Sequence, residues 1–160
     1  MASFADQVAT IGRFIAVADP GAEAAANEMA DAFKPVVQRV LLSRSHAFAT
    51  KTPSPPGSPP AAISGELAAS IMNTPAIGGG AVWESKSGPT TRYGRIQELG
   101  GVMTGHPTMH WWEDGVPHWS HQHSLPPRPY LAPTVDAMAD SGELGDAAAA
   151  AFSVLFDAVS

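Results

Sequence analysis

Hydrophobic residues recur at helical spacing near the start of the chain. Apolar side chains separated by four, three and four positions predict an amphipathic helix, with Ser3 as its N-cap. The sequence ADPG at 18–21 predicts the end of that helix, because proline and glycine both disfavour a helix interior. The side chains of this first stripe are Phe4, Val8, Ile11 and Ile15.

Two further helical patterns follow, one after residue 21 and one at the end of the chain. Pro35 predicts a kink in the first of them, or the start of a new helix. Gly142 predicts a break before the last helix. We expect the stripe at the start of the chain and the first of these two further stripes to pack in a core or against a partner. The first comprises Met29, Phe33, Val36, Val37, Val40 and Leu41, and the second Leu144, Ala148, Phe152, Leu155 and Val159.

The region between these helices has the pattern of short strands. We predict strands near 76–87, 90–98 and 102–123, with a hairpin turn at Asp114-Gly115 and an inserted aromatic hairpin over 106–124. The glycines at 78–80 predict a bend. Together the patterns predict one α+β domain of 160 residues, in which a small antiparallel sheet packs against a long N-terminal helical region and a C-terminal helix.

Two proline-rich segments interrupt the patterns. Residues 50–62 predict an arm or linker in a polyproline conformation, followed by a short helix that begins after Ser64. Residues 126–133, PPRPYLAP, form the second segment, which we call the proline strap. Its four prolines exclude a helix interior or a central strand, so we expect a stiff connection that sets the angle between two elements. Tyr130 and Leu131 are predicted to be buried under the last helix.

Composition excludes several classes of protein. Charged residues make up 15% of the chain, the net charge is -6 and no basic cluster is present, so a tightly held nucleic acid is not expected. The absence of cysteine excludes disulfides. No apolar run reaches the length of a membrane span, and the N-terminal residues lack a signal-peptide pattern. A surface with so few charges is typical of a protein that is covered by partners.

Histidines between residues 106 and 123 are the only chemical cluster that the sequence offers. A metal-dependent enzyme that uses His106, His110, His118, His121 and His123 is one hypothesis, although their spacing matches no familiar zinc motif. We favour a contact surface, because tryptophan is enriched where proteins meet. We therefore predict no catalytic, metal or cofactor site. The predicted contact residues are Pro55, Pro56, Pro59, Trp111, Trp112, Trp119, His121 and His123.

Three motifs occur in an order that resembles a known family. ISGELAASI supplies Gly65, Leu67 and Ile71; YGRIQELGG supplies Tyr93, Glu98 and Gly100; PPRPYLAPT supplies Pro127, Pro129, Tyr130, Leu131 and Pro133. With helices at both ends, this order is similar to the neck, or head–tail joining (tail completion), family of long-tailed bacteriophages, related to the lambda minor tail protein Z group. The chain departs from the family in the longer, aromatic stretch between His106 and His123, and in Ala132, where the family often has arginine.

The resemblance implies a structural virion protein without a cofactor. Such a protein would be assembled in the bacterial cytoplasm into a ring, expected to be sixfold, at the head–tail interface. Its neighbours would be head-closure or adaptor proteins and tail terminator or tail-tube proteins, and DNA would pass through it without specific binding. A tail terminator or head-closure (stopper) ring is the nearest alternative. An adaptor that binds a host module through residues 53–60 is another.

Overall fold

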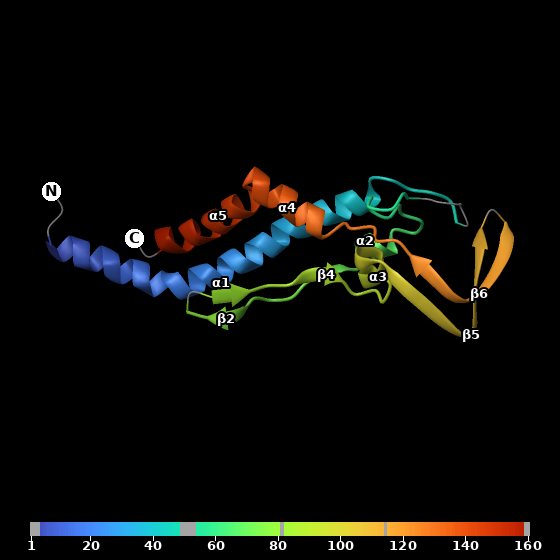
Figure 1. Cartoon of the computed structure of the whole chain (residues 1–160). Coiled ribbons are helices and arrows are strands. Elements are labelled where there is room, and N and C mark those ends of the chain that lie inside the picture. The colour runs from blue at the N-terminus through green and yellow to red at the C-terminus, as the bar shows by residue number, and fades with distance from the viewer. Residues whose placement is uncertain (1–3, 49–53, 81, 114, 159–160) are drawn as a thin grey trace. The chain divides into compact units, whose positions relative to one another are not determined.

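The computed structural model describes residues 4–48, 54–80, 82–113 and 115–158 and has an α+β fold, as expected (Figure 1). Helices open and close the described chain, and short strands lie between them. In chain order the elements are α1 (Phe4–Leu42), α2 (Glu66–Ala69), β1 (Ile71–Asn73), β2 (Ile77–Gly79), β3 (Val82–Glu84), β4 (Ser87–Pro89), α3 (Gly94–Leu99), β5 (Gly101–Glu113), β6 (Val116–Leu125), α4 (Ala132–Ser141) and α5 (Glu143–Ala158).

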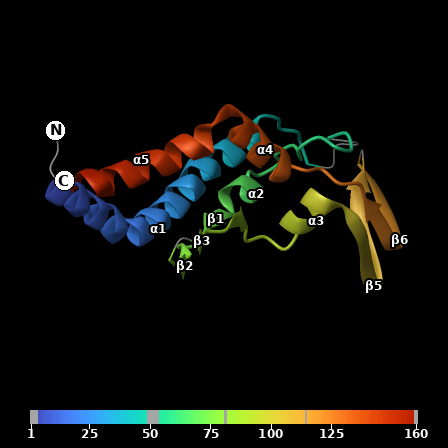
Figure 2. The same cartoon turned by 60° about the vertical axis from the view of Figure 1, so that its left-hand side comes forward.

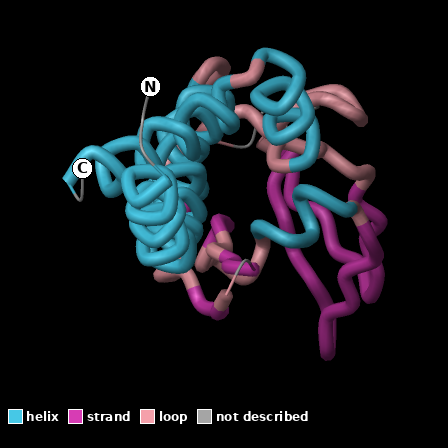
Figure 3. Tube along the Cα trace, turned by 90° about the vertical axis from the view of Figure 1, so that its left-hand side faces the viewer, coloured by secondary structure: helices cyan, strands magenta, loops and turns pink. Residues whose placement is uncertain are grey.

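The strands form three separate two-stranded sheets, which Figure 3 shows in magenta. They pair as β1 with β4, β2 with β3, and β5 with β6. The predicted strand over 90–98 is wrong, because α3 occupies most of it. The predicted strand at 76–87 is a tight hairpin, in which Gly80 turns the chain at a φ of 63°. The bend expected at the glycines 78–80 is confirmed.

Helix α1 runs without interruption through both positions where a break was predicted. The break expected at 18–21 is wrong, and Pro35 starts no new helix. Gly21 is buried in the helix, and a Cβ atom there would lie 2.5 Å from ring carbons of Phe152. Phe152 belongs to α5, and close packing of α5 on α1 can outweigh the poor helix propensity of proline and glycine.

The chain divides into two compact units. One contains the described residues within 1–34, 73–87 and 137–160, and the other those within 35–72 and 88–136. Helices α1 and α4 and strands β1 and β4 each contribute residues to both units. No helix in the described ranges combines the length and the apolarity that spanning a membrane requires.

In the first unit, α5 lies beside the N-terminal part of α1 in Figures 1 and 2. The ring of Phe14 stands 5.9 Å from that of Phe152 and 6.2 Å from that of Phe156. Of the stripe at the start of the chain, Val8, Ile11 and Ile15 are exposed, and Ile15 is 67% accessible, so they lie in no core and their packing against a partner stays a prediction. The side chain of Phe4 lies outside the described residues. The predicted stripe of α5 is half-buried over its described residues, while Val159 lies outside them. Buried apolar residues of this unit are Val17, Ala26, Ala30, Phe33, Ala76 and Met138.

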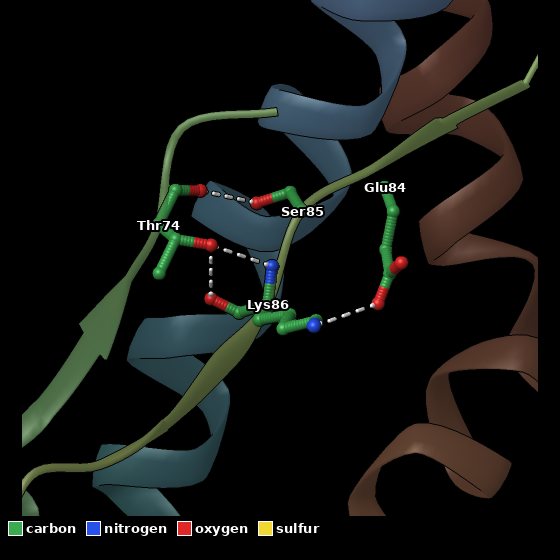
Figure 4. A network of polar contacts seen from close by, with 4 residues as sticks. All are labelled: Thr74, Glu84, Ser85 and Lys86. Carbon is green, nitrogen blue, oxygen red and sulfur yellow. Dashed lines mark hydrogen bonds and ion pairs between the residues drawn. The ribbon is translucent and has the colours of Figure 1, made fainter. Parts of the chain in front are cut away.

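Side chains of α1 also fix the segment from 73 to 87. Asn27 Oδ1 accepts a hydrogen bond of 2.8 Å from the Ala76 amide, and Asp19 Oδ1 accepts one of 2.7 Å from Trp83 Nε1. Where the segment returns, Thr74 pairs with Lys86 and accepts a bond from Ser85, as Figure 4 shows. Polar contacts therefore hold this segment at its two ends and on α1.

The second unit has a small core centred on the C-terminal end of α1. Val37 and Leu41 of the predicted stripe are buried, whereas Val36 and Val40 are half-buried. Ile71 and Tyr130 have no accessible surface, and Thr134 and Ser54 are buried polar residues. The predicted burial of Tyr130 is confirmed and that of Leu131 is wrong, because Leu131 is only half-buried, while their position under the last helix stays a prediction.

Candidate functional site

Two of the sequence motifs meet at the carboxylate of Glu98. Its Oε2 atom accepts hydrogen bonds from the backbone amides of Tyr130 (2.7 Å) and Leu131 (3.0 Å), and its Oε1 atom accepts one from Ala132 (3.1 Å). Ala132 begins α4. The carboxylate therefore satisfies amides that a helix N-terminus leaves without partners, and its charge suits the positive end of the helix dipole. We call Glu98 with residues 130–132 the Glu98 node.

Further bonds hold the proline strap on α3. The amide of Arg128 donates to the Gln97 carbonyl over 2.7 Å. The hydroxyl of buried Tyr130 donates to the Gly94 carbonyl over 3.3 Å. Burial, and to a lesser degree the neighbouring charges of Glu98 and Tyr93, raises the pKa of Tyr130 well above its usual range. The strap is therefore fixed by α3, and Pro133 lies in the first turn of α4, where its missing amide hydrogen costs no bond.

Gly100 allows the chain to leave α3 beside the strap. Its φ of 67° lies in the region that favours glycine. A Cβ atom at this position would lie 2.7 Å from the Pro127 nitrogen and 2.9 Å from the Leu125 carbonyl oxygen. The motif glycine therefore has two functions, a left-handed turn and a close approach to the strap backbone.

The described part of the proline arm folds back on the strap. The amide of Gly57 donates to the Pro127 carbonyl (2.9 Å), and Arg128 Nε donates to the Ser54 carbonyl (3.1 Å). The buried Ser54 hydroxyl accepts the Ala61 amide over 2.8 Å and closes the loop. Residues 54–62 thus form an ordered loop, while 50–53 lie outside the described residues. Of the predicted contact residues, Pro55 and Pro56 are exposed and Pro59 is half-buried.

The first motif lines a groove of about 280 Å³ in the second unit. Ile71 is buried in β1, Leu67 is half-buried, and Gly65 is the N-cap residue of α2, with a φ of 77°. The predicted N-cap is displaced by one residue, although the Ser64 hydroxyl accepts the Glu66 amide over 3.3 Å. Burial and then the nearby Glu66 carboxylate raise the pKa of Tyr93, which also lines the groove.

Strands β5 and β6 form the predicted hairpin, which is longer than expected and which we call the hairpin ribbon (yellow to orange in Figure 1). Trp112 pairs with Pro117, His110 with Trp119, and the register shifts between Thr104 and Met109. The rings of His110 and Trp119 lie 6.2 Å apart and those of His110 and Trp112 6.0 Å apart, so one face of the ribbon groups these aromatic side chains. Trp119 is 64% exposed and Trp112 45%.

The other predicted contact residues of the ribbon are dispersed. His121 is exposed, and His123 is half-buried opposite Met103. Trp111 pairs with His118 through the backbone, and its side chain lies outside the described residues. Among the side chains that the structure describes, no three His, Asp or Glu residues are grouped so as to hold a metal ion.

Three residues that hold the strap beside the node were not identified from the sequence. Arg128 is the only charged residue among the eight of the strap, and this isolation was the available signal. The Ser54 hydroxyl accepts the Ala61 amide, and the carbonyls of Ser54 and Gln97 each accept a bond from Arg128. No sequence motif marks Ser54 or Gln97. Comparison with protein families, with curated protein sequences and with solved structures finds no match.

Proposed function

We propose that this chain is a structural component of a bacteriophage neck, which assembles as a ring and joins the tail to the capsid. The observation that carries the proposal is the Glu98 node. Motif residues separated by more than thirty positions meet there, Glu98 with Tyr130 and Leu131, through charge-assisted hydrogen bonds. Two of the three motifs that carry the family resemblance thus share one physical purpose, to fix the direction in which α4 leaves the strap.

Exposed apolar side chains support a role in assembly. The hairpin ribbon exposes Trp112 and Trp119, and α1 exposes a stripe that contains Ile11 and Ile15. Large exposed apolar residues that cluster on one element are typical of surfaces covered by another protein. The low content of charged residues, 15%, agrees with such surfaces. In a ring of this acidic chain, we expect the lumen to carry neutral or acidic side chains, so that DNA slides past without being held.

The test is removal of the gene from the phage that encodes the chain. We expect filled heads and finished tails that do not join, and we expect purified protein added to the lysate to restore infectious particles. Heads that lose their DNA would instead indicate a head-closure ring, and tails of irregular length would indicate a tail terminator. Normal particles without the chain would contradict the proposal.

Variants of the node make this test specific. Glu98→Ala protein should restore joining poorly, because α4 is no longer held at its first turn. The matched control is Glu28→Ala, which removes an exposed carboxylate from the middle of α1. Glu28→Ala should restore joining as well as the unchanged protein does.

A further inference from the structure

The hairpin ribbon has two edges that no described strand covers. Strands β5 and β6 pair only with each other and form a sheet of their own. An isolated two-stranded hairpin is marginally stable in water, and unpaired backbone groups along an edge favour the addition of another strand. At 13 and 10 residues, these strands are far longer than the other strands of the chain.

The ribbon lacks charged protection against edge pairing at its base, although prolines and a register shift protect its middle and its tip. Natural edge strands are commonly protected by lysine, by inward-pointing charges or by very short length. Strand β6 contains no Asp, Glu, Lys or Arg, and β5 contains only Glu113, at the end next to the turn. Pro107 in β5 and Pro117 in β6 each interrupt a strand, and the register shift after Thr104 divides the ladder in two. Both edges of the ladder near its base, at 101–104 and 122–125, are free of proline.

We propose that the ribbons of neighbouring copies pair edge to edge, with β5 of one copy beside β6 of the next. This inference deepens the proposed function, and it rests on that function only for the arrangement of the copies in a ring. A foreign strand would cover one edge and leave the other open. A β5-to-β6 contact between copies covers both edges of every copy and repeats around a closed ring.

Charge also favours a second copy as the partner. The chain has a net charge of -6, so most surfaces of two copies repel each other at neutral pH. The strands of the ribbon carry a single acidic residue and no Lys or Arg, so two copies can approach there without opposing charges. A neutral surface offers nothing to a partner that is selected by charge, whereas it complements itself. The exposed Trp119 would then be covered by the adjacent ribbon.

The absence of cysteine allows a direct test by disulfide trapping. One set of full-length proteins carries a single cysteine on β5, and a second, differently tagged set carries one on β6. Neither protein can form a disulfide within its own chain. All the substituted positions are exposed; they are Val102→Cys, Met103→Cys and Thr104→Cys on β5, and Gln122→Cys and Ser124→Cys on β6.

Concentrated mixtures of the two sets are oxidised and the dimers are sorted by their tags. We expect mixed β5–β6 dimers to exceed both same-site dimers by about tenfold for at least one combination, because strand pairing raises the local thiol concentration. The matched control mixes Ala139→Cys with Ala149→Cys, both exposed on helices. Dominant same-site dimers would show a twofold contact and overturn the proposal, as would mixed dimers no more abundant than in the control.

A charge placed on the edge provides an independent check. Gln122→Lys, made in the chain that carries Ser124→Cys, should lower the yield of mixed dimers several-fold, while Ser153→Lys on α5 should not. Equal yields from these two variants would contradict edge pairing. The whole test uses purified protein and no phage. Pairing without a defect in head–tail joining would therefore refute the proposed function alone, and the reverse would refute the pairing alone.

Discussion

The Glu98 node and the hairpin ribbon belong to the same compact unit, yet they are stabilised in opposite ways. In the node, one carboxylate joins amides from a segment more than thirty residues away, and Tyr130 beside it has no accessible surface. In the ribbon, the strands bond to each other and Trp119 is largely exposed. One part of the unit is thus held by bonds within the chain, whereas the other leaves large apolar side chains exposed, which a partner would cover under the proposed function.

Among the variants that test this contrast between the node and the ribbon, Tyr130→Ala should lower the stability of the protein most. Removing a fully buried aromatic side chain leaves a cavity, so the free energy of unfolding should fall by about 3–5 kcal/mol. Urea denaturation measures the loss. Tyr93→Ala is the control, because Tyr93 is partly exposed, and its loss should be clearly smaller. Equal losses would mean that the node does not depend on the burial of Tyr130.

Gly100→Ala should lower the stability of the protein nearly as much as Tyr130→Ala does. A left-handed φ costs a non-glycine residue about 1–2 kcal/mol, and a Cβ atom close to the strap backbone adds a similar amount of strain. Gly142→Ala separates the two causes, since Gly142 has a φ of 84° and no atom within 4 Å of the added Cβ. We expect thermal denaturation to show a clearly lower melting temperature for Gly100→Ala than for Gly142→Ala. Similar melting temperatures would exclude the close approach as a cause.

Glu98→Ala should lower the free energy of unfolding by about 1–3 kcal/mol, because the amides of residues 130–132 lose a charged acceptor. Hydrogen exchange locates the effect. Protection should fall at these amides, while Glu28→Ala leaves it unchanged. Unchanged protection in Glu98→Ala would show that other groups hold the strap.

High pH should weaken the unit through Tyr130. Its pKa is raised in the folded protein above the ordinary value of 10.0, so the folded state retains this proton longer than the unfolded state does. The associated stability is therefore complete below about pH 10 and is lost as the pH rises further. The decline in unfolding free energy above pH 10 should be shallower in Tyr130→Phe. Parallel pH profiles for the two proteins would contradict this assignment.

Trp119→Ser should have the smallest effect on stability and a larger one on association. Because the indole is exposed, the unfolding free energy of the separate chain should change by no more than about 0.5 kcal/mol. Sedimentation at high concentration should show weaker self-association, and head–tail joining should decline. A large loss of stability with unchanged association would reverse the contrast between the ribbon and the node.

Local signals in the sequence predicted much of the fold. The Asp-Gly pair marked the ribbon turn, and Gly142 marked the break before α5. These predictions succeeded because each depends on the conformation of one or two residues. Helix α1 continues through Pro20 because Gly21 packs closely against Phe152, which is far away in the sequence. A local sequence pattern does not indicate such a contact.

The candidate site was predictable in its residues but not in its mechanism. The motifs selected Glu98, Gly100 and Tyr130, yet nothing in the sequence indicated that one carboxylate would accept the amides of the strap. Residues 50–62 were expected to form an arm or linker because proline and serine dominate their composition. Ser54 and Arg128 fold its described part back on the strap through individual side-chain bonds, which composition does not encode.

Electron cryo-microscopy of the neck in intact phage particles tests most directly whether the chain is a building block of the head–tail junction. We expect a ring between capsid and tail whose subunits fit α3, the strap and α4 as described, with β5 of each copy beside β6 of the next. A neck in which every ring is accounted for by other proteins would contradict the proposed function.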